Sequence, residues 1–167
     1  MPNLYKCAFT GLEMVSDAFP TKELYDGVVL AVKSSTINKE AIKMDVGDCD
    51  DVDDQDQQVN DIIDGFRYNQ VTYTKTQFAA VMKGYLKKIS EKIKAESPND
   101  AEKLTLFQKK SVELLKFVVE KFSDFEFFMN ENNDEEGAIT FGYWEDSEND
   151  KGPTFFYFKD AMIREKI

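Results

Sequence analysis

The sequence predicts an α+β fold in which antiparallel β-strands flank a single α-helical hairpin. The first and last thirds of the chain hold short runs of β-branched and aromatic residues bounded by glycine or polar residues, a pattern typical of strands. Between them, apolar residues recur at three- and four-residue steps over two long stretches, which indicates amphipathic helices. The 167 residues suit one domain, 1–167, with a core of its own.

Strands are expected on both sides of the helical region. Each run is short and bounded by turn-forming residues, and a Gly-Pro pair separates the last two runs. Consecutive strands at such spacing favour antiparallel pairing. The expected strands cover residues 4–9, 28–32, 67–73, 125–129, 138–144 and 154–158.

The two helical stretches form a predicted hairpin at about residues 75–122. The apolar stripe of the first helix consists of Phe78, Val81, Met82, Tyr85, Leu86, Ile89 and Ile93. The stripe of the second consists of Leu104, Phe107, Leu114, Leu115, Val118 and Phe122. Ser97 is expected to cap the second helix, with Pro98 in its first turn. Because few residues join the helices, we expect them to be antiparallel and to pack their stripes against the sheets.

A strongly acidic segment precedes the helical region. Nine aspartates and no lysine or arginine lie between Asp45 and Asp64. The isolated valines and isoleucines there show no sustained periodicity, so the segment has too little apolar surface to offset the entropy lost on ordering. We therefore predict a mobile acidic loop at about residues 40–62.

The composition narrows the classes of function. The chain has no histidine and no glycine-rich phosphate motif, which removes histidine-based catalysis, histidine zinc sites and the usual nucleotide cradles. Its two cysteines, Cys7 and Cys49, are too few for a structural zinc site and are expected to be free thiols. No apolar run approaches the ~20 residues that span a bilayer. We expect a cytoplasmic protein that is not an enzyme and binds no zinc, nucleotide or membrane.

Charge is distributed unevenly along the chain. The net charge is −11, yet residues 75–121 sum to +5, because eleven lysines accompany six acidic residues there. A negative net charge disfavours nucleic acid as a general partner. The basic island suits an acidic polypeptide, although an ordinary solvated helix face also explains these lysines.

Four blocks of residues carry a further signal. They are Glu13-Met14-Val15-Ser16-Asp17, residues 73–87, Phe122 and Phe127-Phe128-Met129 with Glu131 and Glu136-Gly137-Ala138-Ile139, and Phe156-Tyr157-Phe158-Lys159-Asp160. In this order and spacing, the chain resembles the translationally controlled tumour protein family from about residue 3 to 166. It departs from the family in the acidic segment, where Val46-Gly47-Asp48-Cys49-Asp50 replaces a Gly-Gly-Asn-rich block.

The resemblance implies a fold of packed antiparallel sheets (a β-tent, similar to Rab-associated chaperones). One projecting helical hairpin and a long mobile acidic loop belong to that fold. It also implies calcium binding, association with tubulin or microtubules, and regulation of growth and survival. An alternative is that the protein acts as an exchange factor or chaperone for a Ras-like small GTPase. We expect a monomer.

The sequence offers carboxylates but no EF-hand for calcium. The acidic turn that begins at Asn132 fails as an EF-hand because Tyr143 stands where a bidentate carboxylate is required. From the resemblance, weak calcium binding is expected at Asp124 and Glu126. The alternative is a merely solvated acidic surface.

Two further groups of residues are candidates for partner binding. The resemblance implies a polar cleft at Glu13 and Glu131 that contacts a small GTPase; otherwise these are surface or capping carboxylates. The lysines of the first helix sit largely off its apolar stripe, so they could meet an acidic polypeptide, and the resemblance implies the acidic tails of tubulin as that partner. The candidates on this helix are Lys83, Lys87, Lys88 and Lys92.

Overall fold

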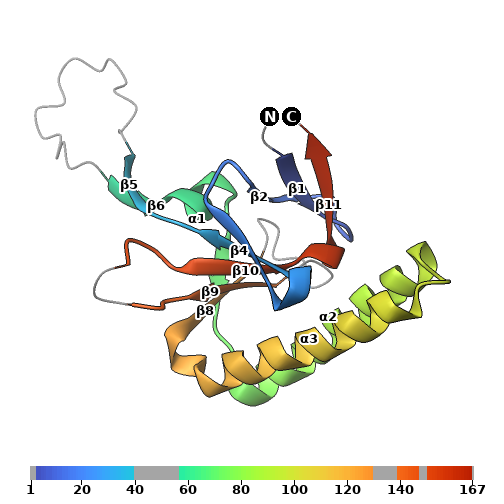
Figure 1. Cartoon of the computed structure of the whole chain (residues 1–167). Helices are drawn as coiled ribbons and strands as arrows, with labels where there is room; N and C mark the ends of the chain where they lie inside the picture. The colour runs from blue at the N-terminus through green and yellow to red at the C-terminus, as the bar shows by residue number, and fades with distance from the viewer. Residues whose placement is uncertain (1–2, 40–56, 130–138, 147–149, 167) are drawn as a thin grey trace, which may run out of the picture.

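A six-stranded antiparallel sheet, sheet B, lies at the centre of the fold (Figure 1). The structure is a computed structural model that describes residues 3–39, 57–129, 139–146 and 150–166. In spatial order the strands of sheet B are β3 (Thr21–Leu24), β4 (Val29–Lys33), β10 (Thr154–Phe158), β9 (Thr140–Tyr143), β8 (Phe125–Met129) and β7 (Asn69–Val71). All neighbouring strands run antiparallel, so the predicted α+β class with antiparallel sheets is confirmed.

Two smaller sheets complete the β-structure. Sheet A has the order β11 (Met162–Lys166), β1 (Asn3–Cys7), β2 (Glu13–Ser16). The third sheet pairs β5 (Thr36–Lys39) with β6 (Gln57–Asn60) and leads into the short helix α1 (Asp61–Gly65). In the view of Figure 1, sheet A lies above sheet B and the long helices lie below it.

The helical hairpin consists of α2 (Lys75–Glu96) and α3 (Ala101–Glu120), whose far end extends beyond the sheets (Figure 1). A capping box starts α2, because Gln77 N donates to Thr74 Oγ1 at 3.1 Å and Thr74 N donates to Gln77 Oε1 at 3.0 Å. The prediction of Ser97 as the cap of α3 is wrong. Ser97 N instead donates to Ile93 O at 2.8 Å and ends α2, while the carboxylate of Asp100 caps α3.

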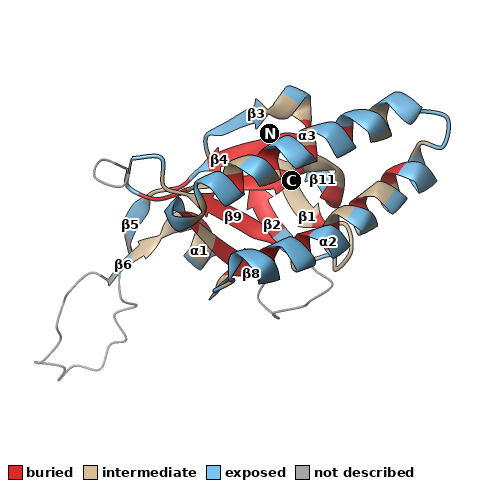
Figure 2. Ribbon diagram, turned by 90° about the horizontal axis from the view of Figure 1, so that it is seen from below, coloured by how far each residue is buried: buried red, intermediate tan, exposed pale blue. Residues whose placement is uncertain are grey.

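Side chains alternate between the two sides of sheet B, and in its central strands both sides are largely buried by another layer, whereas the edge strand β3 is mostly exposed (Figure 2). On one side, Phe158 packs against Phe107 of α3, and Phe141 against Phe78 of α2, each pair with ring centroids 5.8 Å apart. The predicted stripes therefore face the sheet. Their fully buried members are Phe78, Met82, Tyr85, Ile89, Ile93, Phe107, Leu114 and Val118.

On the other side of sheet B, two buried tyrosines connect it to sheet A. The ring of Tyr68 lies 5.8 Å from that of Phe155, and its hydroxyl donates a hydrogen bond to the carbonyl oxygen of Met14 in β2. The Tyr157 hydroxyl lies 2.7 Å from that of Tyr68. Because the hydroxyl proton of Tyr68 is used in the bond to Met14, Tyr157 is the donor in this pair. Burial raises the pKa of both phenols, so both remain neutral at neutral pH.

The β5–β6 ribbon is fixed to the turn that precedes β10. Ser34 Oγ donates to Pro153 O at 2.5 Å and accepts from Asn60 Nδ2 at 2.9 Å. Gly152 fits here because a Cβ atom on it would stand 2.6 Å from Ser34 Oγ. The predicted loop at residues 40–62 is thus wrong at its end, where residues 57–60 pair with β5 and Asn60 caps α1. Residues 40–56 lie outside the described residues.

Cys7 is the last residue of β1 and lies in the core. Its side chain is 0% exposed, its backbone pairs with Met162 of β11, and its N–H donates to Leu12 O at 2.8 Å. It is a free thiol, as predicted, whereas Cys49 lies outside the described residues. Within the ranges that the structure covers, no helix is long and apolar enough to cross a membrane.

Candidate partner-binding site

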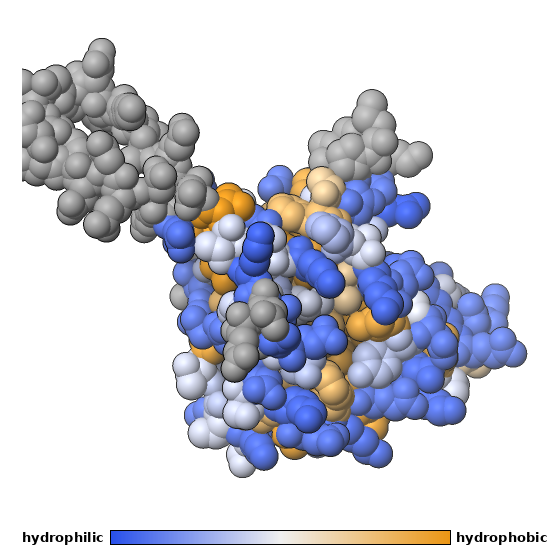
Figure 3. Space-filling model, turned by 60° about the vertical axis from the view of Figure 1, so that its left-hand side comes forward, coloured by the Kyte–Doolittle hydropathy of each residue, from blue (hydrophilic) through white to orange (hydrophobic). Residues whose placement is uncertain are grey.

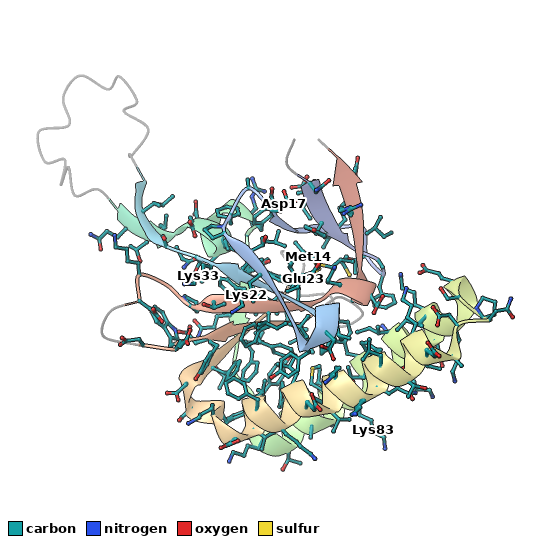
Figure 4. All side chains as sticks on the ribbon, in the orientation of Figure 1. Met14, Asp17, Lys22, Glu23, Lys33 and Lys83 are labelled. Carbon is teal, nitrogen blue, oxygen red and sulfur yellow. The ribbon has the colours of Figure 1, made fainter. Side chains whose placement is uncertain are left out.

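The outer face of α2 carries the exposed lysines of the hairpin. Lys83, Lys87 and Lys94 are four and seven residues apart, which places them on one side of the helix, opposite the buried stripe. Figure 4 shows Lys83 pointing away from the sheets. None of the three forms an ion pair with another described residue. We call these three residues the α2 lysine face.

The other two predicted lysines of α2 make contacts within the protein instead. Lys88 is half-buried, with its Nζ 5.7 Å from the ring centroid of Phe9 in a cation–π contact. The side chain of Lys92 is only 18% exposed, and its Nζ lies 2.8 Å from Glu96 Oε1. Both residues flank the apolar stripe, which explains why their stems are partly covered. They are therefore less suited to a partner than Lys83 and Lys87.

Two lysines of α3 tie the hairpin to turns of sheet B. Lys110 Nζ lies 3.2 Å from Asp26 in the 3₁₀ turn η1 (Tyr25–Gly27) and 3.3 Å from Glu113. Hydrogen bonds with Asp26 and Glu113 raise the pKa of Lys110. Lys103 lies 3.4 Å from Asp160 in η3 (Lys159–Ala161). Sequence periodicity could not find the pairs with Asp26 and Asp160, because these two partners are distant in the chain.

Glu13 is exposed at the start of the edge strand β2. It stands opposite Lys6 of β1, but the Lys6 ammonium lies 2.8 Å from Glu165 of β11. Glu165 raises the pKa of Lys6 most, and Glu13 adds a smaller contribution. Glu131 lies outside the described residues, so the predicted polar cleft at Glu13 and Glu131 stays a prediction.

The two carboxylates predicted for calcium have different surroundings. Glu126 uses both oxygens: Oε2 accepts from Gln70 Nε2 at 2.9 Å, and Oε1 accepts from the indole N–H of Trp144. Asp124 is exposed in the 3₁₀ turn η2 (Phe122–Asp124). In the described part of the chain, no three acidic or cysteine side chains gather as a metal site would require. Nothing in this geometry favours Glu126 as a calcium ligand, and weak calcium binding stays a prediction.

On the face shown in Figure 3, hydrophilic side chains cover most of the surface and apolar ones appear in patches between them. A few large apolar side chains are exposed elsewhere, including Val112 and Val119 of α3. Scattered residues of this kind are normal on soluble domains, so charge is the feature that distinguishes the α2 lysine face.

Comparison with known proteins extends this description to nearly the whole chain. The family model described as "Translationally controlled tumour protein" matches residues 3–163. A solved structure of the translationally controlled tumor-associated protein p23fyp from Schizosaccharomyces pombe superposes with a TM-score of 0.79 at 25% identity, covering 99% of each chain. The translationally controlled tumor protein of Caenorhabditis elegans gives a TM-score of 0.74 at 22% identity, covering 99% of this chain and 98% of that one, and shows the common fold.

Proposed function

This chain belongs to the translationally controlled tumour protein family, and from that premise we propose that it is a non-enzymatic binding protein whose α2 lysine face binds acidic polypeptide segments. The partner that we propose is tubulin, through the acidic tails that project from microtubules. Through this binding the protein would serve the growth and survival functions expected from the family resemblance, in the cytoplasm.

The proposal rests mainly on the exposed lysines of α2 that form no ion pair with another described residue. Lys83, Lys87 and Lys94 are exposed and have no ion-pair partner among the described residues, while the lysines that flank them are engaged inside the protein. The chain as a whole carries −11. An acidic partner is therefore attracted to this face and repelled by most of the remaining surface.

Helical geometry adds a physical reason for a flexible, acidic partner. Residues spaced by four and seven positions on one helix present a row of charges along its axis. Lysine is a mobile point charge with little directional preference, so such a row suits an unstructured acidic tail better than one fixed carboxylate. The single acidic residue beside the row, Glu91, is exposed as well.

Co-sedimentation with microtubules tests this proposal. The variant Lys83→Glu/Lys87→Glu/Lys94→Glu should lose binding, because it reverses the charge of the α2 lysine face without touching a described contact. A matched control, Lys22→Glu/Lys33→Glu/Lys151→Glu, changes the net charge equally at exposed lysines of the β-structure and should bind nearly as the parent does.

Salt and tail removal provide two further readouts. Parental binding should weaken markedly between about 50 and 200 mM salt, since the Debye length is only ~10 Å at 0.1 M. Microtubules whose acidic tails have been removed with subtilisin should not bind. Retention of binding by the α2 variant, or an equal loss in the control variant, contradicts the proposal.

A second proposal is a role as exchange factor or chaperone for a Ras-like small GTPase. What supports it is the accessibility of Glu13 on the edge strand β2, in a block that resembles the family motif. A nucleotide-release assay with the parent and Glu13→Gln separates the two proposals. Acceleration by the parent but not by the variant supports the GTPase role, whereas no acceleration by either protein rejects it.

A further inference from the structure

A groove of about 790 Å³ lies on the hairpin side of sheet B, between strands β3, β4 and β10 and Phe117 of α3. We propose that it binds a small organic anion with an aromatic or apolar body, whose anionic group lies between Lys22 and Lys33. This site is separate from the α2 lysine face and does not depend on tubulin binding. Figure 4 shows Lys22 and Lys33 on the sheet, whereas Lys83 lies on the outer side of the helices.

Strand register explains why a groove forms at this point. Ala31 of β4 stands between Lys22 of β3 and Phe156 of β10, so these three side chains share one side of the sheet. Two residue pairs further along, and therefore on the same side of the sheet, Lys33 stands opposite Thr154. Because Ala31 contributes only a methyl group, the floor of the groove is low between taller neighbours. The groove is therefore part of the folded sheet and needs no movement to open.

The walls of the groove are largely aromatic. Phe117, near the end of α3, meets Tyr143 edge-on with ring centroids 5.1 Å apart, and Tyr143 lies 6.1 Å from Phe156. Tyr25 closes the side next to β3. Such rings offer both faces and edges to a planar ligand, and aromatic pairs contribute stability beyond the apolar area that they bury. They would hold the apolar body of the ligand.

The two lysines supply the polar end. Lys22 pairs with Ala31 in the register, and Lys33 lies two residues further along β4, so the two lysines are diagonal neighbours on one side of the sheet. Diagonal neighbours of this kind lie roughly 7–8 Å apart at their Cα atoms, within reach of one anionic group. Both side chains are exposed, and neither has an ion-pair partner among the described residues.

Some other lysines near sheet B are paired with acidic residues, unlike Lys22 and Lys33 among the residues that the structure describes. Lys159 lies 2.6 Å from Glu23, and Lys110 and Lys103 are also paired. Glu23 follows Lys22 directly but points to the other side of β3, so it cannot neutralise the pair. Two like charges on one side of adjacent strands repel each other, and a bound anion removes that repulsion.

One acidic residue at the groove determines the orientation of the ligand. Glu145 lies beyond Tyr143, on β9's side of the groove, two strands away from Lys33. Its charge disfavours an anionic group at that end. The ligand should therefore carry its negative charge at one end only, with a neutral aromatic body pointing toward Tyr143. The groove volume lies within the ~300–1,000 Å³ that is usual for small-molecule sites.

Fluorescent naphthalene dyes provide matched probes of this chemistry. 1-Anilinonaphthalene-8-sulfonate carries an anionic group on an aromatic body, and N-phenyl-1-naphthylamine has the same body without the charge. At neutral pH the parent should bind the sulfonate with saturable, one-to-one fluorescence enhancement. The Lys22→Gln/Lys33→Gln variant should bind it at least about tenfold more weakly, because each charge-assisted hydrogen bond contributes roughly a tenfold change in affinity or more.

Control variants separate this site from general charge effects. Lys83→Gln/Lys87→Gln removes the same charge from the α2 lysine face and should bind the sulfonate within about twofold of the parent. Lys22→Arg/Lys33→Arg keeps the charge and should retain binding. The neutral amine should bind the parent and the double glutamine variant alike. The unfolding midpoint of each variant confirms that the fold is intact.

Three outcomes overturn the proposal. The first is a parent that shows no saturable sulfonate binding, and the second is a double glutamine variant that binds as tightly as the parent. The third is equal weakening by the groove variant and the α2 variant, which would show that net charge alone matters. Amide shifts in NMR spectra locate the bound dye independently: they should centre on Thr21, Ala31 and Thr154 and leave the outer side of α2 unchanged.

Discussion

On one side of sheet B, Phe141 and Phe158 meet the helical hairpin through ring contacts alone, whereas on the other side Tyr68 and Tyr157 also form hydrogen bonds. The contacts between phenylalanine rings depend on how closely the side chains fill the space between the layers, and they involve no titratable group. Hydrogen bonds between buried hydroxyls fix one arrangement and leave a costly unpaired group when one partner is removed. The two sides should therefore respond differently to truncation, to removal of single atoms and to pH.

The largest effect is expected on the hairpin side. Phe107→Ala should lower the free energy of unfolding by about 3–5 kcal/mol, because it leaves a cavity beneath Phe158. Leu115→Ala should cost less, since Leu115 is only half-buried. Urea unfolding of the two variants measures the difference. A Phe107 variant with the parental midpoint would mean that the hairpin does not rest on the sheet.

A smaller effect is expected from a single hydroxyl on the tyrosine side. Tyr157→Phe keeps the ring but removes the donor to Tyr68, and it should cost about 1–2 kcal/mol. Tyr5→Phe serves as the matched control, because Tyr5 is half-exposed and should change stability by less than about 0.5 kcal/mol. If the two substitutions cost the same in urea unfolding, the hydroxyl pair does not stabilise the contact between sheets A and B.

The tyrosine side should also make stability sensitive to alkali. Burial raises the pKa of Tyr68 and Tyr157 on this side, and also of Tyr85 in α2 on the hairpin side, so the folded protein keeps protons that the unfolded chain releases near pH ~10. Stability should be constant with respect to these groups below pH ~10 and should fall as the pH rises further, toward the raised values.

Urea unfolding between pH 8 and 11 measures this dependence. Tyr157→Phe removes one of the buried phenols, so its stability should fall less steeply with pH than that of the parent. Comparing the slopes cancels the titration of lysines, which both proteins share. Identical slopes would show that the Tyr157 phenol does not contribute to the alkaline loss.

The smallest effect concerns the rim of the tyrosine side, where Glu126 accepts from Gln70 and Trp144. If calcium binds at Asp124 and Glu126, as the family resemblance implies, a divalent cation comes to lie on the carboxylate that accepts from the indole N–H of Trp144. The emission of Trp144, the only tryptophan, should then shift on addition of millimolar calcium and not in Asp124→Asn/Glu126→Gln. An unchanged spectrum of the parent would remove Glu126 from the calcium hypothesis.

Much of the fold was predictable because local periodicity determines it. The three- and four-residue steps from Phe78 to Ile93 bury one face as a helix. The run from Phe155 to Phe158 is short, aromatic and preceded by Gly152-Pro153, which favours a strand buried on both sides. The start of α3 was misplaced because Ser97 and Asp100 both have the side chain of a cap, and only the path of the chain decides between them. The β5–β6 ribbon was missed because its polar residues form no apolar pattern.

The candidate sites were less predictable than the fold, because they depend on tertiary contacts. The exposure of Lys83 and Lys87 followed from their position on the helix, and Lys92 with Glu96 is a local i,i+4 pair. The contact of Lys88 with Phe9 depends instead on what packs against the helix. That Lys22 and Lys33 are diagonal neighbours on adjacent strands could be seen only from the register of β3 and β4. Charge counts along the chain contain none of this information.

Because Cys7 is buried, its reaction with a thiol reagent can measure how often the protein opens locally around β1. A thiol reagent can reach this side chain only when β1 separates from its neighbours, because the residue is fully enclosed in the folded state. In a Cys49→Ser variant, Cys7 is the only thiol, so the rate of its modification would report the separation of β1 from its neighbours. If the rate saturates with reagent concentration, it equals the opening rate itself; if it stays proportional, it reports the equilibrium population of the open form. The opening of sheet A could thus be measured separately from that of the hairpin. A ligand bound in the groove would slow the modification of Cys7 only if the groove and β1 open together.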